Sequence, residues 1–385
     1  MTPDRAIEDA LAPHVQGDDP PGLAWLVARG DDVRAGSIGT HEPVGGGGIA
    51  RDTIFRISSV TKPVCAVVAM MLLDDGVLSL DDPVQEWLPE LADRRVLAEP
   101  NGPLTATVPA HRPITVRDVL TFRLGTGMDF TGPFPGVVLE AMTASGLNVG
   151  PPAPAVNPEP AEWMRRFGEL PLMVQPGERW LYHTSAEVLG VLLARAAGEP
   201  LPGLLAERLF DPLGMTSTAF DVPPERRGRF GPQWASNPGT GALERYDDAD
   251  GQWSRPPAFP GAGDGLVSTV DDLYALADLL RGGGATARTG RLVSEESVRA
   301  MTTDYVGGVA DAAGLIGWGF ATGVQIADAP GGRPAGSYGW DGGMGSTWWI
   351  DPASGVVGIL LTNRAWSTAG PSPVFDAFWG AVHAT

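Results

Sequence analysis

The hydrophobic positions of this chain fall into blocks whose spacing predicts both strands and helices. Residues 22–28 and 32–38 are apolar-rich runs separated by a short Gly-Asp turn, which is the pattern of a β-hairpin. Residues 59–75 are apolar almost all round, so we expect a helix buried in the core. A shorter amphipathic helix is expected over residues 4–15.

Helical and strand patterns both return in the second half of the chain. Residues 186–197 and 201–209 have helical apolar spacing, and a Gly or Pro follows each. Residues 346–351 and 355–363 are two predicted strands around a Pro-Ala-Ser-Gly turn. A last helix is expected over about residues 374–382.

Strand patterns at both ends, with helices between them, define the predicted fold class. We expect an α+β protein in which an antiparallel sheet flanked by helices is built from residues 1–75 and 260–385. Residues 76–259 would form a mainly helical, loop-rich insertion domain. Ordered loops are expected where Gly, Pro and Thr dominate and periodicity is weak, in residues 99–113, 129–160 and 222–262.

Composition and charge narrow the class of partners. The chain is 43% hydrophobic and 19% charged, as in globular proteins. Its net charge of −19 opposes phosphate backbones and anionic membranes, so we expect neither nucleic acid nor a membrane as partner. The polar N-terminus and the absence of a long apolar run predict a cytoplasmic protein. The single cysteine, Cys65, is expected to be a buried, inert thiol.

One short motif gives the strongest indication of chemistry. Ser59 and Lys62 stand at the start of the buried helix, three residues apart, which puts both side chains on one face. A serine needs a base to attack a carbonyl group, and a lysine can be that base if burial or a helix end destabilises its ammonium form. The pattern alone is common by chance. However, Lys62 is the only lysine in the chain, and all the other basic residues of the Lys/Arg type are arginine. Because arginine cannot lose its proton in a protein, it could not replace a lysine that acts as a base.

Two further segments could complete a site. Tyr182 ends a loop just before a predicted helix, where its phenol could move a proton beside Lys62; packing explains that residue alone equally well. Residues 339–345 are Gly-rich and lead into a predicted strand, so a substrate could approach the backbone closely. Their N–H groups could form an oxyanion hole with that of Ser59, although a simple tight turn is the alternative.

Other catalytic classes find little support in the sequence. No Gly-x-Ser-x-Gly motif indicates a nucleophile-elbow hydrolase, and no Gly-x-Gly-x-x-Gly follows a strand, so we expect no nucleotide cofactor. The histidines lack metal-ligand spacing, so we expect no metal. His183 is the histidine expected nearest the site. The five histidines are His14, His41, His111, His183 and His383.

The order of these motifs resembles that of the serine β-lactamase and penicillin-recognising superfamily. Ser59-Val-Thr-Lys62, Tyr182 and Trp340-Asp-Gly342 match its three elements, and the resemblance covers roughly residues 20–385. The chain is most similar to the family VIII carboxylesterases, which share the class C β-lactamase fold. Supporting matches are Leu78–Val84, Ile114–Leu120, Pro212–Met215 and Gly317–Phe320.

This resemblance implies a β-lactamase/transpeptidase-like fold and a set of roles. Ser59 would be the acylated nucleophile, Lys62 and Tyr182 the proton-transfer pair, and the backbone N–H groups of Ser59 and Gly343 the oxyanion hole. Which of Lys62 and Tyr182 is the base in acylation stays open. The residues expected to bind substrate are Trp340, Asp341, Gly342 and Thr184.

Two departures from the superfamily pattern bear on the substrate. Trp340 stands where β-lactamases and D,D-peptidases usually have Lys or His, and it offers a flat apolar wall in place of a charge. Thr184 stands where they usually have Asn. Both changes favour neutral esters over penicillin-like substrates. The aromatic side chains that could line an apolar pocket, or simply pack in the core, are Phe130, Phe134, Trp234, Tyr246, Trp253 and Phe259.

The leading hypothesis is therefore a carboxylesterase that acts on small or short-chain esters through an acyl-enzyme at Ser59. An amidase, a D-aminopeptidase, an acyltransferase or a weak β-lactamase could use the same three residues. A non-catalytic binding protein is disfavoured because Ser59, Lys62 and Tyr182 are all intact. The sequence leaves the oligomeric state and the physiological ester or amide open.

Overall fold

The computed structural model describes residues 3–15, 20–131, 135–311, 313–329, 332–367 and 372–384. Its α-helices are α1 (Pro3–Leu11), α2 (Thr61–Asp74), α3 (Val116–Leu120), α4 (Val137–Ala144), α5 (Pro160–Glu169), α6 (Thr184–Ala197), α7 (Leu201–Leu205), α8 (Asp211–Leu213), α9 (Val270–Arg281), α10 (Glu295–Met301) and α11 (Pro373–Ala384). The strands of the main sheet are β1 (Gly22–Arg29), β2 (Asp32–Gly39), β11 (Ile316–Trp318), β12 (Gly323–Gln325), β13 (Tyr338–Gly342), β14 (Ser346–Asp351) and β15 (Val356–Thr362). Two-stranded ribbons pair β3 (Phe55–Arg56) with β8 (Val267–Ser268), β4 (Arg95–Leu97) with β5 (Thr107–Pro109), β6 (Gln233–Ser236) with β7 (Leu243–Asp247), and β9 (Ala285–Thr286) with β10 (Gly290–Arg291).

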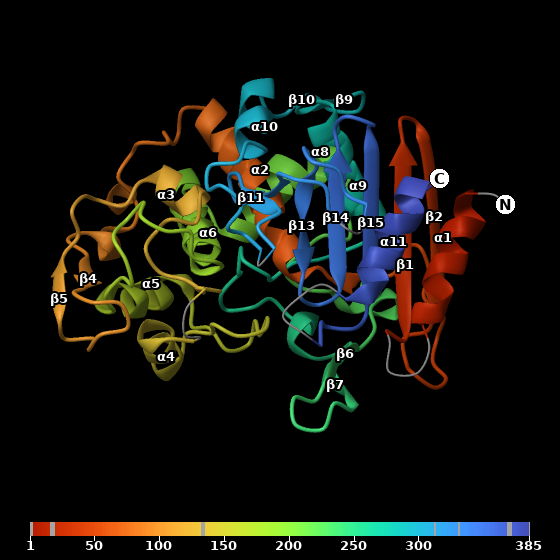
Figure 1. The fold of residues 1–385 in the computed structure, drawn as a ribbon, viewed down its shortest axis with the longest axis horizontal. Helices are drawn as coiled ribbons and strands as arrows, with labels where there is room; N and C mark the ends of the chain where they lie inside the picture. Colours follow the sequence, from red (N-terminus) through yellow and green to blue (C-terminus); the bar gives the residue numbers. More distant parts are fainter. Residues whose placement is uncertain are drawn as a thin grey trace.

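The main sheet joins the two ends of the chain. Its seven strands have the order β11-β12-β13-β14-β15-β1-β2, and every neighbouring pair is antiparallel. Trp25 on β1 lies opposite Leu360 on β15 and Gly36 on β2. Figure 1 shows β1 and β2 in red beside the blue C-terminal strands. The predicted hairpin over 22–28 and 32–38, the antiparallel sheet and the α+β class are confirmed.

Helices cover both faces of this sheet. The indole nitrogen of Trp348 on β14 donates to the carbonyl of Leu273 on α9, at 3.0 Å. The neighbouring residue Thr347 accepts instead from the indole of Trp379 on α11, at 3.1 Å. Because successive side chains of a strand point to opposite faces, α9 and α11 lie on opposite sides of the sheet. α1 packs against α11, near the two labelled ends of the chain (Figure 1).

Helix α2 is buried along most of its length, as its apolar sequence predicts. Every residue from Thr61 to Leu72 is buried, and the helix contacts α6 and α10. Cys65 lies inside this block, and burial raises the pKa of its thiol, as expected for an inert cysteine. The turn just before the helix, Ser58–Val60, contacts β13 and β14. The start of α2 is therefore fixed against the sheet.

All three segments that we expected to be loops contain regular structure. Residues 99–113 include β5, which pairs with β4. Residues 129–160 include α4, in which Val138, Leu139 and Met142 are buried at helical spacing. Residues 222–262 include the β6–β7 ribbon. The expectation was wrong there because these elements are short and flanked by Gly and Pro, so their periodic pattern is weak in the sequence. Tertiary packing stabilises them.

The division into two domains stays a proposal. All strands of the main sheet lie within residues 1–75 or 260–385. Within residues 76–259, the described part forms α3 to α8 and the ribbons β4–β5 and β6–β7. In Figure 1, α3, α4, α5 and the β4–β5 ribbon lie to one side of the sheet.

Helix length and composition bear on whether the chain could cross a membrane. Within the part of the chain that the structure describes, no single helix is long and apolar enough to do so. Residues Thr184–Ala197 and Leu201–Leu213 meet the length and composition criteria only as a pair bent by 80°.

Candidate active site

Ser59 lies in a strained turn where α2 meets the sheet. Ser58, Ser59 and Val60 form one 3-10 turn that runs directly into the helix. Ser58 has a φ of +46°, in the left-handed region that residues with a side chain seldom adopt. Such strain costs about 1–3 kcal/mol and is concentrated at functional sites. The turn holds Ser59 at the surface of the core, with 9% of its area exposed.

Lys62 lies beneath Ser59, wholly inside the protein. Its Nζ donates to Oγ of Ser59 at 2.9 Å and to the carbonyl oxygen of Gly263 at 2.6 Å. It also lies 3.4 Å from Nδ1 of His183 and 4.6 Å from the centre of the Tyr182 ring. The structure therefore brings the predicted nucleophile and the predicted base into hydrogen-bond contact, although their roles stay predictions.

Tyr182 reaches the same point from the segment before α6. Its backbone is held by two hydrogen bonds with Met128, of 2.8 and 2.9 Å. Its hydroxyl accepts a hydrogen bond of 2.7 Å from Nε1 of Trp340. Trp340, which we expected to be only an apolar wall, thus also orients the phenol. Sequence reasoning missed this bond because its partners are 158 positions apart.

The Gly-rich segment at the end of β13 packs against the turn that carries Ser59. A Cβ added to Gly342 would lie 2.5 Å from the carbonyl oxygen of Ile57 and 3.2 Å from the backbone nitrogen of Ser59. Oγ of Ser346 donates to the same carbonyl at 2.7 Å. Gly343 follows, with no atom within 4 Å of the place of a Cβ. The backbone of this segment therefore lies beside Ser59, and the oxyanion hole itself stays a prediction.

Asp341 and Thr184 are placed differently from the other predicted site residues. The carboxylate of Asp341 accepts a hydrogen bond of 2.8 Å from Nε1 of Trp349 and lies 3.4 Å from Nη1 of Arg333. Because neighbours on a strand face opposite ways, Asp341 points away from the side on which Trp340 meets the phenol. This placement argues against a substrate contact by the Asp341 side chain. Thr184 is buried as the first residue of α6.

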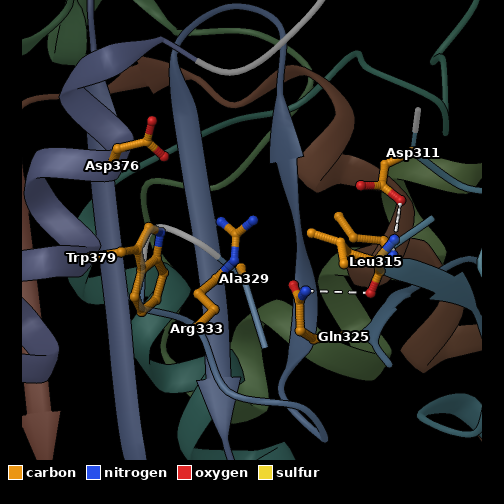
Figure 2. Close-up of a pocket in the computed structure, with 8 residues that line it drawn as sticks. Asp311, Leu315, Gln325, Ala329, Arg333, Asp376 and Trp379 are labelled. Atoms are coloured by element: carbon orange, nitrogen blue, oxygen red, sulfur yellow. Dashed lines mark hydrogen bonds between the residues drawn. The ribbon is translucent and has the colours of Figure 1, made fainter. Parts of the chain in front are cut away.

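A separate pocket lies beside the Arg333 side chain (Figure 2). Its volume is about 200 Å³, and Gln325, Asp376 and Trp379 are among the residues that line it. The Arg333 guanidinium lies over the rings of Trp349 and Trp379, 4.5 and 5.7 Å from their centres. None of the residues of the Ser59 site lines this pocket.

His183, which we expected near the site, lies next to Lys62 with two acidic side chains that the sequence analysis did not single out. Nε2 of His183 is 3.3 Å from Oε1 of Glu187 and 3.9 Å from Oδ2 of Asp264. Burial raises the pKa of Asp264 to about 6, because desolvation disfavours the charged carboxylate. The helical spacing of His183 and Glu187 is visible in the sequence, whereas no pattern connects either of them with Asp264. We call these three residues the histidine cluster.

The histidine cluster is the group of donors in the described part of the chain that could hold a metal ion. One donor atom of each residue lies within 4.8 Å of the others. However, the other ring nitrogen of His183 is 3.4 Å from Nζ of Lys62. An ammonium there would repel a divalent cation bound to the same ring. The contact between His183 and Lys62 therefore disfavours a metal ion at the cluster.

Aromatic rings other than that of His183 also surround Tyr182. Phe130 lies 5.7 Å from the Tyr182 ring centre and is 57% exposed. The predicted pocket residues Trp253 and Phe259 are instead buried in the core. Trp234 and Tyr246 are engaged with backbone carbonyls, and Phe134 lies outside the described residues. The rings that meet Tyr182 are Phe122, Phe130, Trp180, Trp318 and Trp340.

Comparison with known proteins identifies the family of this chain and several proteins to which it is similar. The family model described as Beta-lactamase matches residues 7–372. Protein Rv1367c of Mycobacterium tuberculosis is 33% identical over 86% of this chain and 82% of its own length. Esterase EstB of Burkholderia gladioli is 31% identical over 94% of this chain and 91% of its own length. The solved structure of "EstCE1, a hydrolase with promiscuous acyltransferase activity" matches with a TM-score of 0.83 and 24% identity, over 99% of this chain and 98% of that one.

Proposed function

Because the chain belongs to the Beta-lactamase family and is a serine hydrolase, we propose that it is a carboxylesterase acting on small neutral esters through Ser59. The observation that carries this proposal is the contact of 2.9 Å between Oγ of Ser59 and Nζ of Lys62, the chain's only lysine. The relatives support an esterase or acyltransferase in general, and the preference for small esters is our own inference.

In the proposed acylation step, Oγ of Ser59 attacks the ester carbonyl and loses its proton to Lys62 or Tyr182. The carbonyl oxygen gains negative charge, which the N–H groups of Ser59 and Gly343 would stabilise. The bond to the alcohol then breaks, and the stored proton passes to the leaving oxygen. Water repeats these steps on the acyl-enzyme, so no proton is gained or lost by the enzyme over a full cycle.

The proposed substrate class follows from the side chains that surround the phenol of Tyr182. Trp340 places an indole where a carboxylate-binding cation would otherwise stand, and Phe130 extends the apolar surface. Neither side chain carries a positive charge that could pair with a carboxylate on a substrate. A neutral ester with apolar acyl or alcohol parts therefore fits best.

Transfer of the acyl group to an alcohol is the second candidate. The same acyl-enzyme would form, and an alcohol in place of water would accept the acyl group. The structural neighbour EstCE1 is itself described as a hydrolase that also has acyltransferase activity, which favours considering both outcomes. Product analysis in mixtures of water and a short alcohol separates the two outcomes.

The test of the proposed function compares p-nitrophenyl acetate and butyrate with nitrocefin and a D-alanyl anilide. We expect the esters to be turned over fastest, and Ser59→Ala and Lys62→Arg to abolish that turnover. Ser145→Ala, at the residue that directly follows α4, is the matched control and should keep wild-type ester turnover. Ester turnover that survives Ser59→Ala would refute the mechanism. Nitrocefin turnover equal to that of the esters would refute the substrate argument.

A further inference from the structure

We propose that His183 is a positioning residue that, held by Glu187, fixes the direction in which Lys62 faces Ser59. The inference rests on the proposed function and takes Lys62, one of its two candidate bases, as the group that receives the Ser59 proton. It assigns a role to the histidine cluster, which the acylation step itself does not use.

The argument begins with the geometry around Nζ of Lys62. A lysine nitrogen has one bond to carbon and three remaining directions, each of which is an N–H group or the lone pair. Those directions meet the carbonyl oxygen of Gly263 at 2.6 Å, Nδ1 of His183 at 3.4 Å and Oγ of Ser59 at 2.9 Å. When the amine is neutral, two N–H groups satisfy Gly263 and His183, and the lone pair is left for the Ser59 hydroxyl. Without the acceptor on His183, the lone pair is free to turn away.

Nδ1 of His183 can accept a hydrogen bond only if the ring proton is on Nε2. The Nε2 side of the ring faces Oε1 of Glu187 at 3.3 Å and Oδ2 of Asp264 at 3.9 Å. The side chain of Glu187 is only 4% exposed, and its second oxygen has no hydrogen-bond partner among the described residues. A carboxylate buried in this way favours the N–H of the ring as its partner. Glu187 therefore selects the tautomer that leaves Nδ1 open to Lys62.

The backbone at His183 is strained in the conformation that holds its ring beside Lys62. His183 has a φ of +80° and a ψ of −61°, and the N–H of Thr184 donates to the carbonyl of Tyr182 across it at 3.2 Å. This is a strained γ-turn. A Cβ on Gly263 would lie 2.8 Å from Cε1 of His183 and 2.4 Å from Oε1 of Glu187, so only glycine leaves room for the pair. Local strain and a close glycine at one ring are what a position-specific role predicts.

The proposal has a defined pH dependence. A proton added at Nδ1 removes the acceptor and puts a positive charge 3.4 Å from Nζ of Lys62, which disfavours uptake of the Ser59 proton by that amine. Protonation of Nδ1 should therefore lower activity on the acid side. Besides Glu187 and Asp264 within the cluster, the titratable groups that face it are Lys62 and Cys65 from α2, Tyr182 before α6, and Tyr246 on β7.

The first experiment measures kcat and KM for p-nitrophenyl butyrate as a function of pH. His183→Ala should lower kcat about 10- to 100-fold with KM nearly unchanged, the loss expected for one orienting hydrogen bond. His183→Asn places an amide oxygen near the position of Nδ1, so it should recover most of kcat and flatten the acid limb. His111→Gln, at an exposed histidine, is the matched control. A His183→Ala variant with wild-type kcat, or an acid limb unchanged in His183→Asn, would overturn the proposal.

The second experiment reads the tautomer directly and does not need activity. Long-range ¹H–¹⁵N NMR of the protein labelled at its five histidines, with His183→Asn used for assignment, should place the neutral ring proton on Nε2. Glu187→Gln should weaken that preference. A wild-type ring protonated on Nδ1 would overturn the proposal even if ester turnover depends on Ser59. Conversely, loss of the proposed function through Ser59→Ala leaves this measurement unaffected, so the two failures can be told apart.

Discussion

The hydrogen bond from Trp340 to Tyr182 can be removed without emptying the site. Trp340→Phe keeps an aromatic ring against Trp318, whose ring centre lies 4.7 Å away at 86°. It deletes the N–H group that donates to the Tyr182 hydroxyl at 2.7 Å, together with one ring of the indole. A Trp→Phe control at another position, which loses the same ring, is therefore needed to isolate the effect of the donor.

The expected loss of rate follows from the position of the Trp340 N–H group. An acceptor left without its donor in a part-buried place costs about 1–3 kcal/mol. At about 1.36 kcal/mol per factor of ten, that is roughly a 5- to 150-fold loss of rate. Because the bond strengthens when the phenol oxygen carries negative charge, the loss should appear in kcat and leave KM nearly unchanged. We expect a kcat about 10-fold or more below wild type.

The assay is steady-state hydrolysis of p-nitrophenyl butyrate, with thermal unfolding as a check on folding. Trp234→Phe is the matched control, because its Nε1 donates to the carbonyl of His41 at 3.0 Å and its exposed fraction, 9%, equals that of Trp340. The control should keep wild-type kcat. A Trp340→Phe enzyme with kcat within about twofold of wild type, or with its whole loss in KM, would refute a role for this bond in proton transfer.

Three further predictions concern other contacts. Burial raises the pKa of Asp264 from 3.8 to about 6, so folding favours its protonated form, and this contribution to stability is lost as pH rises from about 4 to 6. Asp264→Asn should therefore become progressively more stable than wild type over this window, by up to about 3 kcal/mol in urea unfolding. A difference in stability that does not change with pH would contradict this sign. Arg56→Met leaves the buried carboxylate of Asp247 unpaired and should cost about 3–5 kcal/mol of unfolding free energy, most of which the added change Asp247→Asn should restore. Gly342→Ala would put a Cβ 2.5 Å from a backbone oxygen and should lower kcat/KM about 100-fold, whereas Gly228→Ala, at a glycine with open space, should not.

The parts of the site that lie close together in the chain could be predicted from the sequence. A separation of three residues on a helix fixes the relation of Ser59 and Lys62 whatever the rest of the chain does. The same holds for the helix itself, because an unbroken apolar surface has no stable place except the core. The β1–β2 hairpin was likewise predictable from its turn and its apolar runs.

The parts that depend on tertiary approach could not be predicted. The bond between Trp340 and Tyr182, and the meeting of Asp264 with His183, join segments whose spacing carries no periodic signal. Helix α4 was missed for a related reason: it is short, and the residues that stabilise it lie elsewhere in the chain. A resemblance in motif order supplied Tyr182, but it could not supply the hydrogen-bond partner that orients the phenol.

Two of the six non-glycine residues with positive φ in the described part of the chain adjoin the candidate site. Ser58 and His183 both have positive φ, and each immediately adjoins a predicted catalytic residue, Ser59 or Tyr182. Each strained turn is also matched by a glycine from a distant segment, Gly342 beside the first and Gly263 beside the second, that has no room for a Cβ. A conformation that costs about 1–3 kcal/mol persists only when the surrounding contacts determine it. The strain therefore indicates that tertiary packing, more than local sequence, sets the backbone on which the Ser59 and Tyr182 side chains stand.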